Sequence, residues 1–222
     1  MKLLGRRVAA LVSLLGTIAF SLCVAAAGSA DTLRTDVELT TKDADSKEST
    51  LADVVADAIR SAASSDAAFL TASSFNDVTL PKGTVSTADI LKALEYKDDN
   101  IVVVKLTGDQ IVRALAQGLY LYPRPNSGFL QVSGLTVTVN PNAEKEKRIV
   151  SVKVGGEPVQ AGKTYRVAMP APLANGALAY FKVWKKSDIE KDTNKTLETA
   201  LKAYLIERRT LSKGDDRLVI KK

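Results

Sequence analysis

The segment IVVVKLTGDQIVRALAQG, residues 101–118, limits the possible folds of this chain more than any other part of the sequence. Its first six residues are almost all apolar and mostly β-branched, which is typical of a strand buried on both faces of a sheet. Thr107 and Gln110 follow at once in the spacing of a helix capping box, and an amphipathic pattern then runs to Gly118. A buried strand that leads straight into a helix predicts a sheet with helices packed against it.

Similar patterns recur along the chain. Thr50 and Asp53 have the capping spacing that begins an amphipathic helix, and Gly155 with Gly156 predicts the turn of a hairpin. Further helices are expected at residues 50–63, 86–96 and 194–209. Residues 67–75 predict a short buried strand that runs into a polar loop, and further strands are expected at 128–139, 148–159, 164–170 and 216–220. The sequence shows no internal repeat. The expected fold class is therefore α+β, a single domain over residues 50–222 with a mixed or antiparallel sheet and packed helices.

The first thirty residues have the layout of a secretory signal peptide, because cationic residues precede an apolar run that ends in the small residues of positions 28–30. An uncleaved anchor is the alternative, since the apolar stretch of residues 8–27 approaches the length of a membrane-spanning helix. Cleavage of residues 1–30 would leave a secreted or periplasmic chain without a membrane span, beginning near Asp31. The polar residues 31–49 then predict a short strand at most, followed by a flexible segment.

Histidine is absent from all 222 residues, and the single cysteine, Cys23, lies in the predicted signal peptide. The usual general base and the commonest transition-metal ligand are therefore missing, which excludes serine–histidine and zinc–histidine chemistry. Loss of the signal lowers the formal charge from +6 to +3 (6 minus 3), because Lys2, Arg6 and Arg7 leave with it. Such a small charge indicates a solvated surface rather than a nucleic-acid site. We expect no metal site, no cofactor and no nucleic-acid partner.

Two strings, VVVKLTGDQI and FLQVSGLTVTV, carry a resemblance to a known family. Together with the order of the other elements, they make residues 48–181 similar to the C-terminal domain of the 5′-nucleotidase family. The resemblance implies an α+β domain that supplies the substrate-binding half of a two-domain nucleotide hydrolase. In complete members the catalytic half is an N-terminal metallophosphoesterase domain that holds two metal ions. Nothing before Thr50 matches that domain, so catalysis by this chain alone is not expected.

The substrate loops of the family are only partly matched. Complete members have an NGGGIR loop after the first strand, in which an arginine meets anionic groups, whereas residues 71–77 read TASSFND. A second motif supplies an aromatic residue that stacks on the base, with a polar neighbour. Tyr96 matches the aromatic position, and Asp98, Asp99 or Asn100 the polar one. The alternative is that Tyr96 closes its helix against the core.

The third loop, PAPLANGALAYF at residues 170–181, matches the family in shape rather than in chemistry. In the family this loop carries an asparagine, a second stacking aromatic and the sequence GGDGY, whose acid holds the nucleoside. Here Pro172 stands for the aromatic, and Leu178 replaces the acid. Gly176 is kept, and Ala179 stands before the final tyrosine of the motif.

Tyr96, Asn100 and Gly176 are therefore the candidates for contact with a nucleoside or nucleotide, and no residue is expected to be catalytic. The expected function is an exported, non-catalytic binding or accessory module with a degenerate nucleotide site. One alternative is the substrate-binding subunit of a nucleotide hydrolase that a separate metallophosphoesterase completes; another is a structural envelope protein without a small ligand. We expect the C-terminal helix to cover the apolar loop, because its own apolar face needs a surface.

Overall fold

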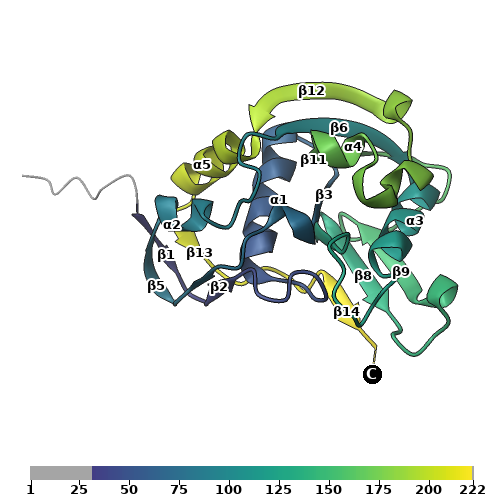
Figure 1. Ribbon diagram of the computed structural model, residues 1–222, viewed down its shortest axis with the longest axis horizontal. Coiled ribbons are helices and arrows are strands. Elements are labelled where there is room, and N and C mark those ends of the chain that lie inside the picture. Colours follow the sequence, from purple (N-terminus) through teal and green to yellow (C-terminus); the bar gives the residue numbers. More distant parts are fainter. Residues whose placement is uncertain (1–31, 222) are drawn as a thin grey trace, which may run out of the picture.

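The computed structural model describes residues 32–221 (Figure 1), so the predicted signal peptide lies outside the described residues. The helices are α1 (Thr50–Ala63), α2 (Thr87–Leu91), α3 (Gly108–Gly118), α4 (Ala171–Ala174) and α5 (Leu197–Glu207). The strands are β1 (Thr32–Thr35), β2 (Leu39–Thr40), β3 (Ala67–Thr71), β4 (Thr79–Leu80), β5 (Gly83–Ser86), β6 (Asn100–Thr107), β7 (Leu130–Ser133), β8 (Leu135–Val139), β9 (Ile149–Val154), β10 (Glu157–Pro158), β11 (Thr164–Pro170), β12 (Ile189–Thr196), β13 (Thr210–Leu211) and β14 (Leu218–Ile220).

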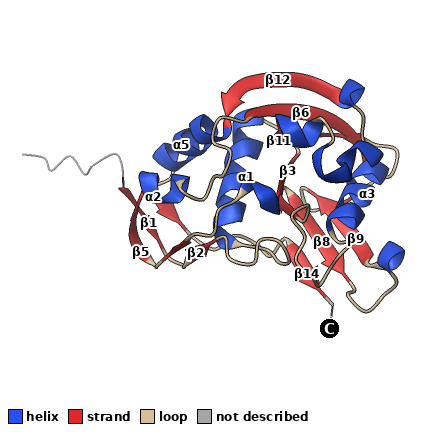
Figure 2. Ribbon diagram, viewed as in Figure 1, coloured by secondary structure: helices blue, strands red, loops and turns tan. Residues whose placement is uncertain are grey.

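The strands form a central sheet and three smaller ones. The central sheet has five strands in the order β12-β6-β11-β3-β7, and a four-stranded sheet has the order β10-β9-β8-β14. Strands β13-β1-β5 and β2-β4 form the other two sheets. Within the central sheet β3 and β11 run parallel and the other neighbours antiparallel. The predicted α+β class with a mixed sheet is confirmed (Figure 2).

The central sheet separates two hydrophobic cores. Successive side chains of β6 point to opposite faces, so that Val102 and Val104 enter one core while Ile101 and Val103 enter the other. The first core also contains α3 and the inner residues of β8 and β9. The second contains α1, α2 and α5. Because both faces are covered, the strand of residues 101–107 needs apolar residues at successive positions, as its sequence predicted.

Strands β7 and β8 follow each other in the chain but lie in different sheets. The alternating run of residues 128–139 predicted one strand, and the structure divides it at Gly134. Gly134 has a φ of +74°, and a Cβ atom there would collide with the carbonyl oxygen of Asp66. Glycine alone adopts this backbone freely and leaves room for the neighbouring chain. The chain therefore passes from the central sheet to the second sheet at Gly134.

Residues 32–49 differ from the flexible segment expected from their composition. Their two strands place Leu33 and Leu39 in the second core. The buried side chain of Gln131 holds the following turn, because its amide donates to the carbonyls of Ala44 and Lys47 and its oxygen accepts from the Ser49 amide. These partners lie far away in the sequence, so a local reading of polarity does not reveal them.

Two expected helices are shorter in the structure. The helix predicted over 86–96 ends at Leu91, because the amides of Ala93 and Leu94 bond in tight turns to Ile90 and Leu91. The helix predicted over 194–209 is α5, and the strand β12 precedes it. Strand β12 is polar along most of its length and is held by pairing with β6 rather than by an apolar face. Within residues 32–221, no helix combines the length and the apolar character that crossing a membrane requires.

Replacing Gly134 by alanine should lower the free energy of unfolding by about 2 to 5 kcal/mol, the sum of the left-handed backbone cost and of overpacking. Gly156→Ala is the matched control, because Gly156 has a φ of +88° but no heavy atom within 4 Å of an added Cβ. It should cost only about 1 to 2 kcal/mol. Chemical denaturation measures both. Equal losses would contradict the close approach of the chain at Gly134.

Candidate functional site

Four segments meet at the end of the central sheet where β3 and β11 finish and β6 and β7 begin. The Ser73 amide, after β3, donates to the Ser127 carbonyl at 3.1 Å. The Tyr180 hydroxyl, after β11, donates to the Gly128 carbonyl at 2.7 Å. Pro170 at the end of β11 pairs with Ile101 near the start of β6. We call this end of the domain the loop face, made of residues 71–77, 96–100, 120–129 and 170–181.

The loop of residues 170–181 has an unusual backbone. Gly176 has a φ of +93°, and an added Cβ would lie 2.7 Å from the Cβ of Phe181, so this position requires glycine. Leu178 and Ala179 are also left-handed, with φ values of 53° and 68°. Ala179 stands where the family motif GGDGY has glycine. The loop therefore takes a left-handed path at two residues that do not adopt it freely.

Two aromatic residues anchor this loop in the first core. Tyr180 and Trp184 stack with their ring centroids 4.9 Å apart. The Trp184 indole donates to the Leu173 carbonyl at 3.2 Å, while Tyr180 bonds to the neighbouring loop. Burial raises the pKa of the Tyr180 hydroxyl well above its usual value, so the group stays a neutral donor. The strained backbone is therefore fixed at its C-terminal end.

The outer side of the same loop is apolar and exposed. Phe181 is 65% exposed and Leu178 is 40% exposed, and Pro172 and Ala177 are exposed as well. The expectation that the C-terminal helix covers this loop was wrong. Helix α5 lies beside α1 (Figure 1) and buries its apolar side chains in the second core. The apolar side chains of α5 pack against α1, so they do not contact the loop of residues 170–181.

The candidate contact residues all lie at the loop face, but they are not joined to one another. Tyr96 is 54% exposed, which disagrees with the alternative that it closes a helix against the core. Asn100 begins β6, and its side-chain amide donates to Asp192 at 3.1 Å. Burial, together with the charge of Asp98, raises the pKa of Asp99. No hydrogen bond within the described chain links Tyr96, Asn100 and Gly176.

A sequence profile of the family described as "5'-nucleotidase, C-terminal domain" matches residues 26–185. The chain belongs to this family. Its matched range begins inside the segment expected to be a signal peptide and ends before β12, so β12, α5, β13 and β14 lie beyond it.

Relatives of this 5′-nucleotidase C-terminal domain are much longer proteins. The mouse 5'-nucleotidase is 28% identical over 102 residues, which are 42% of this chain and 18% of the relative. The trifunctional nucleotide phosphoesterase protein YfkN of Bacillus subtilis is 32% identical over 94 residues, 40% of this chain and 6% of the relative. The solved 5'-nucleotidase precursor of Thermus thermophilus superposes with a TM-score of 0.75 at 25% identity. The match covers 85% of this chain and 39% of the Thermus chain.

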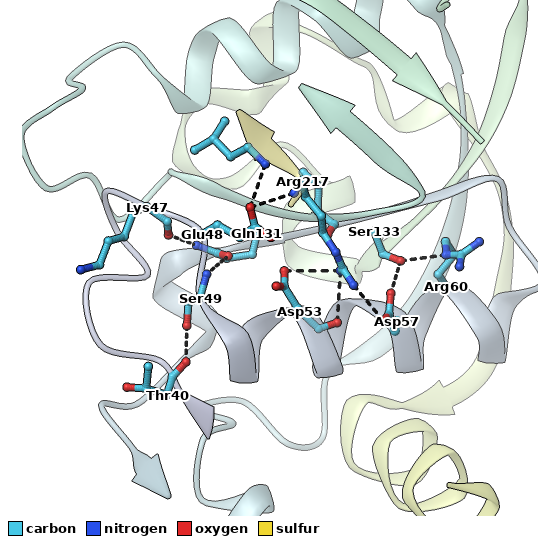
Figure 3. Close-up of polar contacts among 12 residues, drawn as sticks. Thr40, Lys47, Glu48, Ser49, Asp53, Asp57, Arg60, Gln131, Ser133 and Arg217 are labelled. Atoms are coloured by element: carbon cyan, nitrogen blue, oxygen red, sulfur yellow. Dashed lines mark hydrogen bonds and ion pairs between the residues drawn. The ribbon is translucent and has the colours of Figure 1, made fainter. Parts of the chain in front are cut away.

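The C-terminal strands, outside the family match, are held to α1 by Arg217 (Figure 3). Its side chain is 10% exposed and donates to the Asp57 carboxylate at 2.8 Å and to the Val132 carbonyl at 2.7 Å. The carboxylate of Glu48 accepts from the backbone amides of both Arg217 and Leu218 at 2.8 Å. This Arg217 cluster ties the end of the chain to α1 and β7. Its only signal in the sequence was a single arginine in a polar tail.

Within the Arg217 cluster, Asp53 has a buried carboxyl oxygen without a hydrogen-bond partner among the described residues. This atom, Oδ1, lies 3.4 Å from the Arg217 guanidinium. Burial raises the pKa of the Asp53 carboxyl to about 8, against the lowering effect of Arg217, and Glu48 and Asp57 raise it further. The folded protein therefore holds a proton here at neutral pH. Within residues 32–221, no three His, Cys, Asp or Glu side chains are grouped so that they could hold a metal ion.

This proton makes stability depend on pH. The folded-state pKa of Asp53 lies above the unfolded value, so its contribution to stability is complete below about pH 4 and is lost as the pH rises through 8. Asp53→Asn, which cannot ionise, should melt above the wild type at pH 8.5, by more than at pH 5. Melting temperatures across that range measure the difference.

Asp89→Asn is the control, because Asp89 is exposed and its hydrogen bond to Lys92 lowers its pKa. Its stability profile should run parallel to that of the wild type above pH 5. A parallel profile for Asp53→Asn would show that Asp53 is ionised in the folded protein.

Proposed function

We propose that this chain is an exported, non-catalytic binding or accessory module whose nucleotide site is degenerate. The observation that carries the proposal is the loop of residues 170–181. Gly176 and Ala179, two positions where the family motif has glycine, have left-handed backbones, but Leu178 is exposed where that motif has its acid. The absence of histidine from the sequence supports a non-catalytic role, because a two-metal phosphoesterase site uses this ligand. The layout of residues 1–30 supports export.

The residues at the loop face support only weak nucleoside binding. Tyr96 is exposed and able to stack on a base, a contact worth about 1 to 3 kcal/mol. Micromolar affinity needs about 8 kcal/mol. Residues 71–77 supply no arginine for an anionic group, and the Asn100 amide already donates to Asp192. The affinity for adenosine or AMP is therefore expected in the millimolar range or weaker.

A second candidate function is the substrate-binding subunit of a nucleotide hydrolase that a separate metallophosphoesterase completes. It is favoured by the exposure of Leu178 and Phe181, because an exposed apolar patch often marks an interface. A metallophosphoesterase domain encoded beside this chain would then gain activity on nucleotides when the chain is added. The double variant Leu178→Asp/Phe181→Asp would abolish that gain, and no gain with the wild type would remove this candidate.

Calorimetric titration tests the main proposal. Adenosine and AMP should bind the mature chain no more tightly than about millimolar, and the chain with added divalent metal should release no phosphate from AMP above background. Tyr96→Ala should weaken any residual binding about 5- to 100-fold, the loss of one stacking contact. Phe181→Ala is the matched control, since Phe181 is an exposed aromatic with no counterpart among the candidate contacts. Micromolar binding of AMP that Tyr96→Ala weakens would overturn the degenerate site.

A further inference from the structure

Two arginines beside the Arg217 cluster have no acidic partner. Arg217 pairs with the Asp57 carboxylate at 2.8 Å, and it lies 3.4 Å from the protonated Asp53 carboxyl. Arg60, on the last turn of α1, and Arg208, directly after α5, form no ion pair within residues 32–221. Unpaired guanidinium groups are free to bind an external anion, and their charge does not depend on pH in the physiological range.

Both guanidinium groups are nevertheless held in place. The Nε of Arg60 donates at 2.7 Å to Ser133, whose hydroxyl in turn donates to Asp57. Figure 3 shows the terminal nitrogens of Arg60 directed away from Ser133 and Asp57. The guanidinium carbon of Arg208 lies 4.4 Å from the centre of the Tyr204 ring, a cation–π arrangement. The remaining N–H groups of both side chains are positioned before any ligand arrives, which lowers the entropic cost of binding.

Arg60 and Arg208 border the same hollow, which has a volume of about 330 Å³. This volume lies at the small end of the range for ligand sites. Ser61 and Ser64 also border the hollow, and their hydroxyls form no hydrogen bond within the described chain. Tyr204 adds its phenol: burial raises the pKa of its hydroxyl and Asp57 raises it further, while Arg208, Arg217 and Arg60 lower it. Because burial has the larger effect, the Tyr204 hydroxyl stays protonated at neutral pH. A protonated hydroxyl can donate a hydrogen bond to an anion.

The negative groups around the hollow are already occupied. The two oxygens of Asp57 accept from Ser133 and from Arg217. The carbonyls of Arg60 and Ser61 at the end of α1 accept from the amides of Ser65 and Ser64. The Ser65 hydroxyl donates to the Ala67 carbonyl. An anion entering the hollow thus meets the donors of Arg60, Arg208, Ser61 and Ser64, while the acceptors of Asp57, Arg60 and Ser61 already have donors of their own.

We propose that the hollow between Arg60 and Arg208 binds a phosphate group, either as inorganic phosphate or as the phosphate of a small monoester. Guanidinium groups bind phosphate oxygens through paired N–H donors, and the serine hydroxyls complete a set of donors around the group. The hollow lies between the C-terminal ends of α1 and α5, away from the loops that carry Tyr96 and Gly176. This site is therefore independent of the nucleotide site proposed above.

Titration of the mature chain with inorganic phosphate and with glycerol 3-phosphate, at constant ionic strength, tests this site. We expect saturable binding at millimolar concentrations, with amide chemical shifts that change at Ser61 and Ser64 in the wild-type protein. Arg60→Gln and Arg208→Gln should each weaken the affinity about tenfold, the loss of one charge-assisted contact. Arg113→Gln is the control, because Arg113 is an exposed arginine on α3 that pairs with Asp109 at 2.9 Å. Its affinity should equal that of the wild type.

The two ligands separate the sources of the phosphate. Equal affinities indicate the free ion, and tighter binding of the monoester indicates a phosphorylated metabolite. Tyr96→Ala should change neither affinity, so a failure at the loop face leaves this result intact. Absence of saturable binding, shift changes confined to other residues, or equal weakening by Arg113→Gln would overturn the proposal. The chemical-shift changes are measured in the wild-type protein, so they test phosphate binding at the hollow even if Arg60→Gln fails to fold.

Discussion

The burial of both faces of the central sheet is the constraint on which the rest of the structure depends. Alternate side chains of β6 lie in two separate cores, so a different set of helices and strands must cover each face of the sheet. Helices α1 and α5 are used on one face, and α3 with the second sheet on the other. The loops at the end of the sheet are therefore joined to buried strands, but within residues 32–221 no helix covers the Leu178 and Phe181 side chains. The exposure of Leu178 and Phe181 follows from this allocation.

Patterns within a short window predicted the buried parts of this fold well. The strand and helix of residues 101–118 appear almost as expected, with the Thr107–Gln110 capping box present. The helix of residues 50–63 also forms, as its apolar periodicity predicted, but the capping role of Thr50 and Asp53 was wrong. Ser49 precedes the helix without a side-chain cap, and the Thr50 hydroxyl donates to the Glu38 carbonyl. Long-range pairing was not predictable in this way. Strand β12 is polar and is held by its pairing with β6. The segment before α1 is held by hydrogen bonds from Gln131, which lies on the distant strand β7. Gly134 could have been recognised as a break, but only the structure shows that it sends the chain into a second sheet.

In the candidate site, too, some features were predictable from the sequence and others depend on contacts between distant residues. The family resemblance located Gly176, whose positive φ and contact with Phe181 explain why glycine is kept there. It did not reveal that Leu178 and Ala179 have left-handed backbones, next to the Tyr180 and Trp184 side chains that are buried in the first core. The Arg217 cluster was invisible for a different reason. A single arginine in a polar tail looks like a solvated charge until the partners on α1 are known.

We propose that the loop face combines the backbone of the family's nucleotide site with replaced side chains, and restoring the side chains separates these two contributions. The measurement is the affinity for adenosine of a variant carrying Pro172→Phe, Ala177→Gly, Leu178→Asp and Ala179→Gly, which rebuilds the aromatic and GGDGY positions of the family. If only the side chains were replaced, this variant should fold as the wild type does and bind adenosine at least about fivefold more tightly, the gain from one stacking contact. A variant that folds normally but binds adenosine no better than the wild type would contradict the view that the backbone of the nucleotide site is intact.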